Sequence, residues 1–147
     1  MTKTPNIENY KVIPMTKTPN IESEKLALIA ELREAGIKHT PEKIVRIAKR
    51  IDGKIIFLEE GTPGKKGSGL AHILERHKAD FSERGISEDQ IPDAVMTTVI
   101  YGEFVCYQRQ KEPRREIYKV SFNDRTHYIA VDIGDNGYIV GANPSSP

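Results

Sequence analysis

The sequence lacks several features that would narrow its class at once. It has a single cysteine, Cys106, so no disulfide bond can form within the chain. No apolar stretch approaches the roughly 18 residues of a membrane span, and the N-terminal residues contain no apolar run of the kind that a signal peptide requires. The formal net charge is only +1, which by itself favours no class of partner.

The chain is long enough to fold without a covalent or metal staple. A domain of 147 residues buries about two-thirds of the surface of its unfolded chain, so we expect one domain with a short appendage. Cys106 lies in the apolar run Phe104–Tyr107, where we expect a buried structural thiol rather than a nucleophile.

The N-terminal segment contains a perfect repeat, since residues 1–8 recur as residues 15–22. Two copies are too few for a solenoid, and the segment is rich in proline and poor in apolar residues. We therefore interpret residues 1–22 as a disordered, duplicated tail or linker, and residues 23–147 as the folded domain.

Charge is unevenly distributed along that domain. Residues 38–66 contain eight Lys or Arg and four acids, and residues 109–119 contain five Lys or Arg and two acids. Residues 80–103 reverse the balance, with six acids and one Arg. A basic face could bind a polyanion, although ordinary solvated charge explains either patch alone equally well.

The first half of the domain predicts a helix and a hairpin. Ser23 can cap a helix that Gly36 ends, and a single helical turn is possible at Pro41. The β-branched runs 44–51 and 54–58 flank Asp52-Gly53, which predicts a hairpin with a type I′ turn.

The remainder predicts two helices and four strands. The helices cover residues 68–79 and 89–101, the second entered at Pro92 and ended by Gly102. The alternating strands cover residues 104–109, 115–122, 126–133 and 138–142. The expected fold class is α+β, with N-terminal helices packed on a four-stranded antiparallel meander and an added β-hairpin.

Two histidines stand on the first of these helices. Leu70, Ile73, Leu74 and His77 share one face, so His77 lies at the end of an apolar stripe, whereas His72 lies about 140° away. Two histidines that chelate zinc from a helix stand at i and i+4, which this spacing does not match. The alternatives are a proton-transferring site behind the lysine-bearing loop, or a packed His77 and a surface His72.

The last strands separate two faces by alternation. His127 shares the face of Ile129, which we expect to meet the helices, whereas Thr126 and Tyr128 point the other way. An open face with aromatic and Arg side chains suits single-stranded RNA, because aromatics stack on bases and Arg contacts phosphates. A short turn fixed by Pro144 could aim the flanking polar residues at this face.

These residue types suffice for RNA cleavage without a metal ion. A base removes the proton of a 2′-hydroxyl, which attacks the adjacent phosphorus, while an acid protonates the 5′-oxygen. Hydrogen-bond donors stabilise the crowded anionic phosphate. Histidine, hydroxyl groups and Arg or Lys are all present.

Two segments also carry a family resemblance. One is Gly69–His77 with the following Asp80-Phe81 and Gly85–Ser87, and the other is the closing Gly137–Pro144. Across residues 43–146 they resemble the barnase/EndoU/colicin/RelE-like nuclease superfamily. They are similar in particular to its phage-type members and to the C-terminal toxin domains of bacterial contact-dependent inhibition and other polymorphic toxins.

The resemblance implies two helices followed by a four-stranded antiparallel sheet, and metal-independent ribonuclease activity, often on tRNA. It also implies a tight neutralising immunity protein. His72 and His77 match the helical histidine motif of the family, and Asn143 with Ser145 match its closing polar segment.

The predicted activity is therefore that of a metal-independent endoribonuclease toxin that needs no cofactor. It would act in the bacterial cytoplasm, delivered as the C-terminal part of a secreted effector. The predicted catalytic residues are His72, His77, Asn143 and Ser145. The predicted RNA-binding residues are Lys65, Lys66, Arg76, Arg109, Arg115, Thr126 and Tyr128.

Two other functions remain open on the sequence. One is a small transferase or hydrolase that acts on nucleotides with the same His and Arg residues. The other is a non-catalytic binding module, either a phage-head accessory domain or the partner protein of a toxin. The acidic segment 80–103 gives the last idea some support.

Overall fold

Helices and the two-stranded sheet come first in the chain, and four consecutive strands follow. The structure is a computed structural model that describes residues 19–110 and 114–146. Its elements are α2 (Pro19–Glu34), η3 (Pro41–Lys43), β1 (Ile44–Lys49), β2 (Ile55–Glu59), α3 (Gly69–Glu83), η4 (Glu88–Gln90), α4 (Ile91–Tyr101), β3 (Glu103–Tyr107), β4 (Glu116–Phe122), β5 (Arg125–Ile133) and β6 (Ile139–Pro144).

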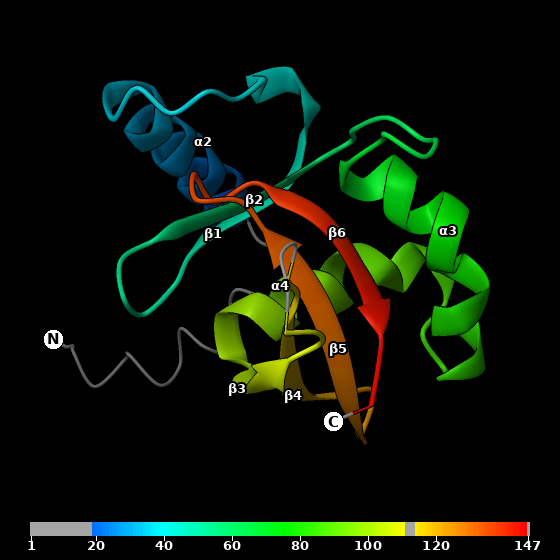
Figure 1. Ribbon diagram of the computed structural model, residues 1–147. Coiled ribbons are helices and arrows are strands. Elements are labelled where there is room, and N and C mark those ends of the chain that lie inside the picture. Colours follow the sequence, from blue (N-terminus) through cyan, green and yellow to red (C-terminus); the bar gives the residue numbers. More distant parts are fainter. Residues whose placement is uncertain (1–18, 111–113, 147) are drawn as a thin grey trace, which may run out of the picture.

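The fold is α+β, as predicted. The hairpin β1-β2 forms one antiparallel sheet, and β3-β4-β5-β6 form a second, in sequence order (Figure 1). The helical turn expected at Pro41 is η3, and all four predicted strands are present.

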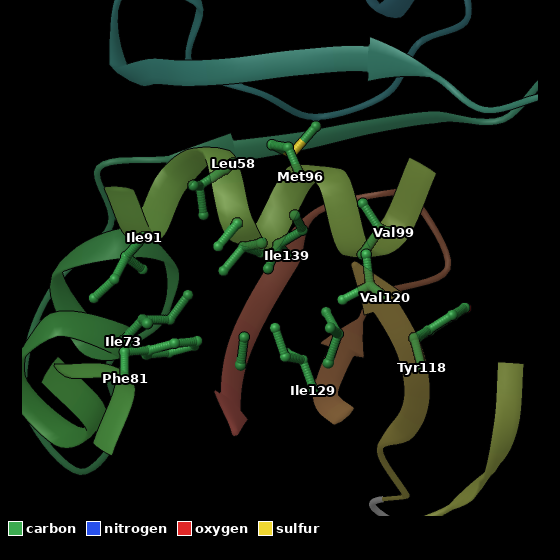
Figure 2. Packing of buried hydrophobic residues seen from close by; sticks show 14 of the residues in the cluster. Leu58, Ile73, Phe81, Ile91, Met96, Val99, Tyr118, Val120, Ile129 and Ile139 are labelled. Atoms are coloured by element: carbon green, nitrogen blue, oxygen red, sulfur yellow. The ribbon is translucent and has the colours of Figure 1, made fainter. Parts of the chain in front are cut away.

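The main core lies between α4 and one face of the four-stranded sheet. Tyr118 and Val120 of β4 and Ile129 and Val131 of β5 are buried there, because side chains two residues apart on a strand share a face. Figure 2 shows α4 between this sheet face and the β1–β2 hairpin. Thr126 and Tyr128 point to the opposite face, as the alternation predicted.

The helix α4 is buried along almost its whole length. Pro92 stands in its first turn, where the missing N–H is tolerated, and Gly102 caps its C-terminus, as predicted. The hydroxyl of the buried Thr98 donates to the carbonyl oxygen of Ala94 at 2.7 Å. That bond offsets the cost of burying a hydroxyl group.

The helix α3 extends four residues beyond the predicted end at residue 79. It ends in a Schellman motif, in which Gly85 N–H donates to the Ser82 carbonyl at 3.0 Å and Ile86 N–H to the Phe81 carbonyl at 3.0 Å. Gly85 has φ 82°, which glycine adopts without steric cost. Phe81 and Ile86 are both buried in the core, so the extra turn is stabilised by packing.

The prediction of a type I′ turn at Asp52-Gly53 is wrong, although the hairpin is present. Gly53 N–H donates to the Arg50 carbonyl and Arg50 N–H to the Lys54 carbonyl, each at 2.8 Å, which closes a three-residue loop. Only Gly53 of this loop has a positive φ, of 94°. The Asp52 carboxylate accepts from Lys54 N–H and from the Arg50 guanidinium, and these bonds stabilise the loop. The two-residue type I′ geometry occurs instead at Asn123-Asp124, with φ 54° and 60°.

The strand β3 is not buried, contrary to the prediction for Cys106 and its neighbours. It is an edge strand of the described sheet, and Phe104 and Tyr107 are 47% and 44% exposed. Cys106 is half-buried. An apolar run alone does not reveal whether a strand lies at the centre or at the edge of a sheet.

The first helix begins at Pro19, four residues before the predicted Ser23, so the end of segment 1–22 belongs to α2. The prediction of a disordered tail for residues 1–18 lies outside the described residues. α2 contributes Ile29 and Leu32 to a second, smaller core with Phe57 of β2.

Candidate functional site

The helix α3 packs against β6 (Figure 1). Polar side chains from both sides of this contact form a cluster. The loop before α3 is closed by reciprocal hydrogen bonds between the backbones of Thr62 and Ser68, at 2.9 and 3.0 Å. A Cβ on Gly61 would overlap the Ser68 carbonyl, so glycine is required for this closure. The loop thereby folds back over the first two turns of α3.

His72 is held by this loop in one tautomer. Its Nδ1 lies 3.0 Å from the carbonyl oxygen of Gly64. Because a carbonyl oxygen only accepts, Nδ1 must carry the proton, and in the neutral ring Nε2 then carries the lone pair. The structure shows no hydrogen-bond partner for Nε2 among the described residues. Nε2 is therefore placed to accept a proton.

Glu75 fixes the same loop from the next turn of α3. Its Oε1 accepts a hydrogen bond from the Gly64 N–H at 2.6 Å. Residues three apart on a helix are neighbours, so His72 and Glu75 both reach the loop. Gly64 is thus tied to α3 through its N–H and through its carbonyl.

The ring of His72 points over Gly141 of β6 toward a guanidinium group. A Cβ built on Gly141 would lie 3.7 Å from Cδ2 of His72 and 3.4 Å from Nη2 of Arg115. The imidazole and the guanidinium therefore approach the same point above the buried backbone of Gly141.

Asn143 holds the guanidinium in this position. Nη1 of Arg115 donates to Oδ1 of Asn143 at 2.5 Å, and Nδ2 of Asn143 donates to the Pro144 carbonyl at 2.8 Å. Asn143 pairs with Ala130 and Gly141 pairs with Asp132, so both β6 residues lie on the sheet face opposite the core.

The structure brings three predicted site residues together: His72 from α3, Arg115 from directly before β4 and Asn143 from β6. Lys65 and Lys66 are exposed in the loop that carries Gly64. They directly follow Gly64, whose carbonyl oxygen contacts His72.

Ser145, Tyr128 and Thr126 continue the same open face beyond Asn143. Ser145 N–H donates to the Tyr128 carbonyl at 2.7 Å, so the β5–β6 pairing runs past Pro144. The turn expected at Pro144 is absent, and the strand carries Asn143 and Ser145 on one face by alternation. Pro144 is tolerated because β6 is an edge strand of the described sheet.

Other predicted site residues are not joined to this cluster. Nδ1 of His77 lies 3.0 Å from the Asp80 carboxylate on its own helix, at the position 140° from His72 that the helical period predicts. Arg76 lies one turn beyond His72 on the same side of α3 and is exposed. Arg109 is exposed beyond the end of β3.

Sequence reasoning missed Gly64, Glu75 and Gly141. Glu75 stands three residues after His72, and this spacing could have marked it as a neighbour on the helix. For Gly64 and Gly141 the sequence holds no such signal, because their role follows from the loop closure and from the strand register.

Two further polar pairs lie outside this cluster, one in the hairpin turn and one on β4. Burial and the hydrogen bond to Glu116, 2.5 Å from the phenol oxygen, raise the pKa of Tyr118 above its usual value. The Arg50 guanidinium lowers the pKa of Asp52, and the Asp52 carboxylate in turn raises the pKa of Arg50. These contacts bear on stability rather than on the cluster at Gly141.

Compared with models of protein families and with curated proteins, the sequence matches none of them. Within residues 19–110 and 114–146, the structure contains no helix of the length and apolarity that crossing a membrane requires. In the same ranges, no three His, Cys, Asp or Glu residues are grouped so that they could hold a metal ion.

Proposed function

We propose that this protein is an endoribonuclease that cleaves RNA by attack of a 2′-hydroxyl group, in a reaction that needs no metal ion. The observation that carries the proposal is the convergence over Gly141. Cδ2 of His72, which is bonded to Nε2, and the guanidinium of Arg115 both lie within 4 Å of the point where a Cβ of Gly141 would stand. A base beside a cation is what this reaction requires.

In the proposed reaction, Nε2 of His72 removes the proton from a ribose 2′-hydroxyl, and the 2′-oxygen bonds to the adjacent phosphorus. The bond from phosphorus to the 5′-oxygen then breaks. The products are a 2′,3′-cyclic phosphate and a 5′-hydroxyl that takes its proton from solvent, because His77 is not joined to the cluster. Arg115, oriented by Asn143, donates to the phosphate oxygens as their charge grows.

The surrounding residues would bind the RNA strand. Lys65, Lys66 and Arg76 lie on the α3 side of the cluster and can contact flanking phosphates. Thr126, Tyr128 and Ser145 continue the open face on the other side. A half-buried Tyr128 offers a ring for an unpaired base.

The family resemblance of Gly69–His77 and Gly137–Pro144 supports a more specific assignment. On that basis the protein is a toxin of bacterial competition, with tRNA as its substrate and a cognate immunity protein as its partner. It would act in the bacterial cytoplasm after delivery as the C-terminal part of a secreted effector.

The test is incubation of the purified chain with total RNA and with tRNA in EDTA. We expect discrete fragments that end in 2′,3′-cyclic phosphate. His72→Ala should slow cleavage about 10²–10⁴-fold, as loss of a proton-transfer group does. His77→Ala is the matched control and should cleave at the wild-type rate. Intact RNA after prolonged incubation would reject the enzyme and favour the non-catalytic binding module.

A further inference from the structure

The exposed edge strand β3 carries an aromatic group that the proposed site does not use. Phe104 and Tyr107 lie with ring centroids 5.2 Å apart and ring planes at 66°. Phe104 also meets Tyr118 of β4, with centroids 6.1 Å apart. Both β3 rings remain nearly half exposed.

A β-bulge is the reason that these two rings meet. In a regular strand, residues 104 and 107 would point to opposite faces, because side chains alternate. The pairing with β4 shifts between Phe104 and Cys106, so that Val105 is an extra residue. A bulge of this kind re-aims side chains, and here it places Phe104 and Tyr107 on the same face.

An arginine completes the group. Cζ of Arg114 lies 4.2 Å from the centroid of the Tyr107 ring, so the guanidinium is stacked over the ring. Arg114 directly precedes Arg115, whose guanidinium lies in the proposed site. Consecutive residues of an extended chain point to opposite faces, so the two arginines flank the edge of the sheet.

We propose that Phe104, Tyr107 and Arg114 form a stacking platform for an unpaired nucleobase of the RNA. The inference rests on the proposed function, because it takes RNA as the ligand. Two exposed rings and a planar cation offer the flat surfaces on which bases stack without regard to sequence. Arg109, exposed just beyond β3, adds positive charge that favours a polyanion.

Positive charge favours RNA over a protein that would add a strand to β3, because Arg109 and Arg114 accompany the exposed rings. Phe104 pairs with Tyr118 of the core face, so the rings lie on the sheet face opposite Gly141. The RNA would pass around the β3 edge, where Arg114 follows one face and Arg115 the other. The same bulge interrupts the outward backbone groups with which an added strand would pair.

The experiment measures binding rather than cleavage. A single-stranded 2′-O-methyl RNA that contains 2-aminopurine cannot react by 2′-attack, and its fluorescence is quenched where the base stacks. The probe is titrated into the full chain carrying His72→Ala, and into the same chain with an additional change at Tyr107. Tyr107→Leu keeps an apolar side chain without a ring, and Tyr107→Phe keeps the ring.

We expect Tyr107→Leu to weaken binding about 5- to 150-fold and to abolish the quenching, and Tyr107→Phe to behave as the parent chain. Phe104→Leu should act in the same direction. Circular dichroism and thermal unfolding check that each variant is folded. Equal binding and quenching by the Leu and Phe variants would overturn the inference and leave a protein partner as the alternative for this surface. A failure of the parent chain to bind the probe would also overturn the inference. If binding depends on the Tyr107 ring but the native chain cleaves no RNA, the stacking platform is supported and the nuclease proposal is rejected.

Discussion

Gly141→Ala separates the chemistry of the cluster from the stability of the fold. The added methyl group would lie 3.4 Å from Nη2 of Arg115 and 3.7 Å from Cδ2 of His72. Both distances are ordinary van der Waals contacts, and the backbone of Gly141 is outside the left-handed region. No neighbour has to move. We expect the free energy of unfolding to stay the same or to rise by about 0.4–1 kcal/mol, because alanine restricts the unfolded chain.

Activity should respond in the opposite direction. The methyl group fills the space in which a substrate oxygen would approach both His72 and Arg115. A displacement of the reacting groups by about 1 Å can lower a rate about 10²-fold. We therefore expect cleavage of tRNA to fall by about two orders of magnitude at an unchanged or higher melting temperature.

The assay pairs initial cleavage rates with thermal unfolding of the same preparations. Gly134→Ala, directly after β5, is the matched control, because a Cβ there would lie 3.0 Å from Oδ1 of Asn136 and 3.7 Å from the Tyr138 carbonyl oxygen, and neither atom belongs to the cluster. It should leave the rate unchanged. Wild-type cleavage by a stable Gly141→Ala variant would refute the placement of the reaction between His72 and Arg115.

Three further predictions concern single contacts. Glu75→Ala should release the loop and remove a bias of about 0.5–1.5 kcal/mol for the Nδ1-protonated ring of His72. The rate should then fall roughly 2- to 10-fold and the ring ¹⁵N signals should shift, whereas Glu75→Gln, which keeps an acceptor oxygen, should resemble the native chain. Arg115→Ala should weaken RNA binding and flatten its salt dependence, since the variant loses a cation that would neutralise a phosphate; unchanged binding would contradict the role of Arg115. Because the pKa of Tyr118 is raised by burial and by Glu116, the neutral phenol stabilises the fold, and this contribution is lost as pH rises above the usual value of 10.0. Unfolding measured between pH 8 and roughly 11 should show a decline that Tyr118→Phe reduces; an equal decline in both proteins would contradict this origin.

Local patterns in the sequence predicted the order and type of the elements. Alternation marked the strands of the meander, and Pro92 and Gly102 marked the bounds of α4, because their backbone requirements hold in any context. The turn at Asp52-Gly53 was predicted wrongly, since the side-chain bonds of Asp52 select a three-residue loop. The burial of β3 was also predicted wrongly, since the position of a strand within a sheet is a tertiary property.

The residue types of the candidate site were predicted from the sequence, but only some of the residues that form it were. His72, Arg115 and Asn143 were each singled out, but their convergence depends on contacts between α3, β4 and β6 that are distant in sequence. His77 was grouped with His72 because both match the helical histidine motif of the family resemblance, although the helical period already predicted a separation of about 140°. In the structure His77 contacts Asp80 on its own helix.

A bulge in β6 decides which side chains reach the proposed site. The register pairs Ile133 with Ile139 and Asp132 with Gly141, so Val140 is an extra residue. Regular alternation would place Ile139 on the same face as Gly141. Either Ile139 would then leave the core, or Gly141 would leave the face on which His72 lies. With the bulge, Ile139 is buried in the core while Gly141 lies beneath His72. The bulge in β3 acts in the same way on its aromatic residues, so both proposed RNA contacts depend on single extra residues in edge strands.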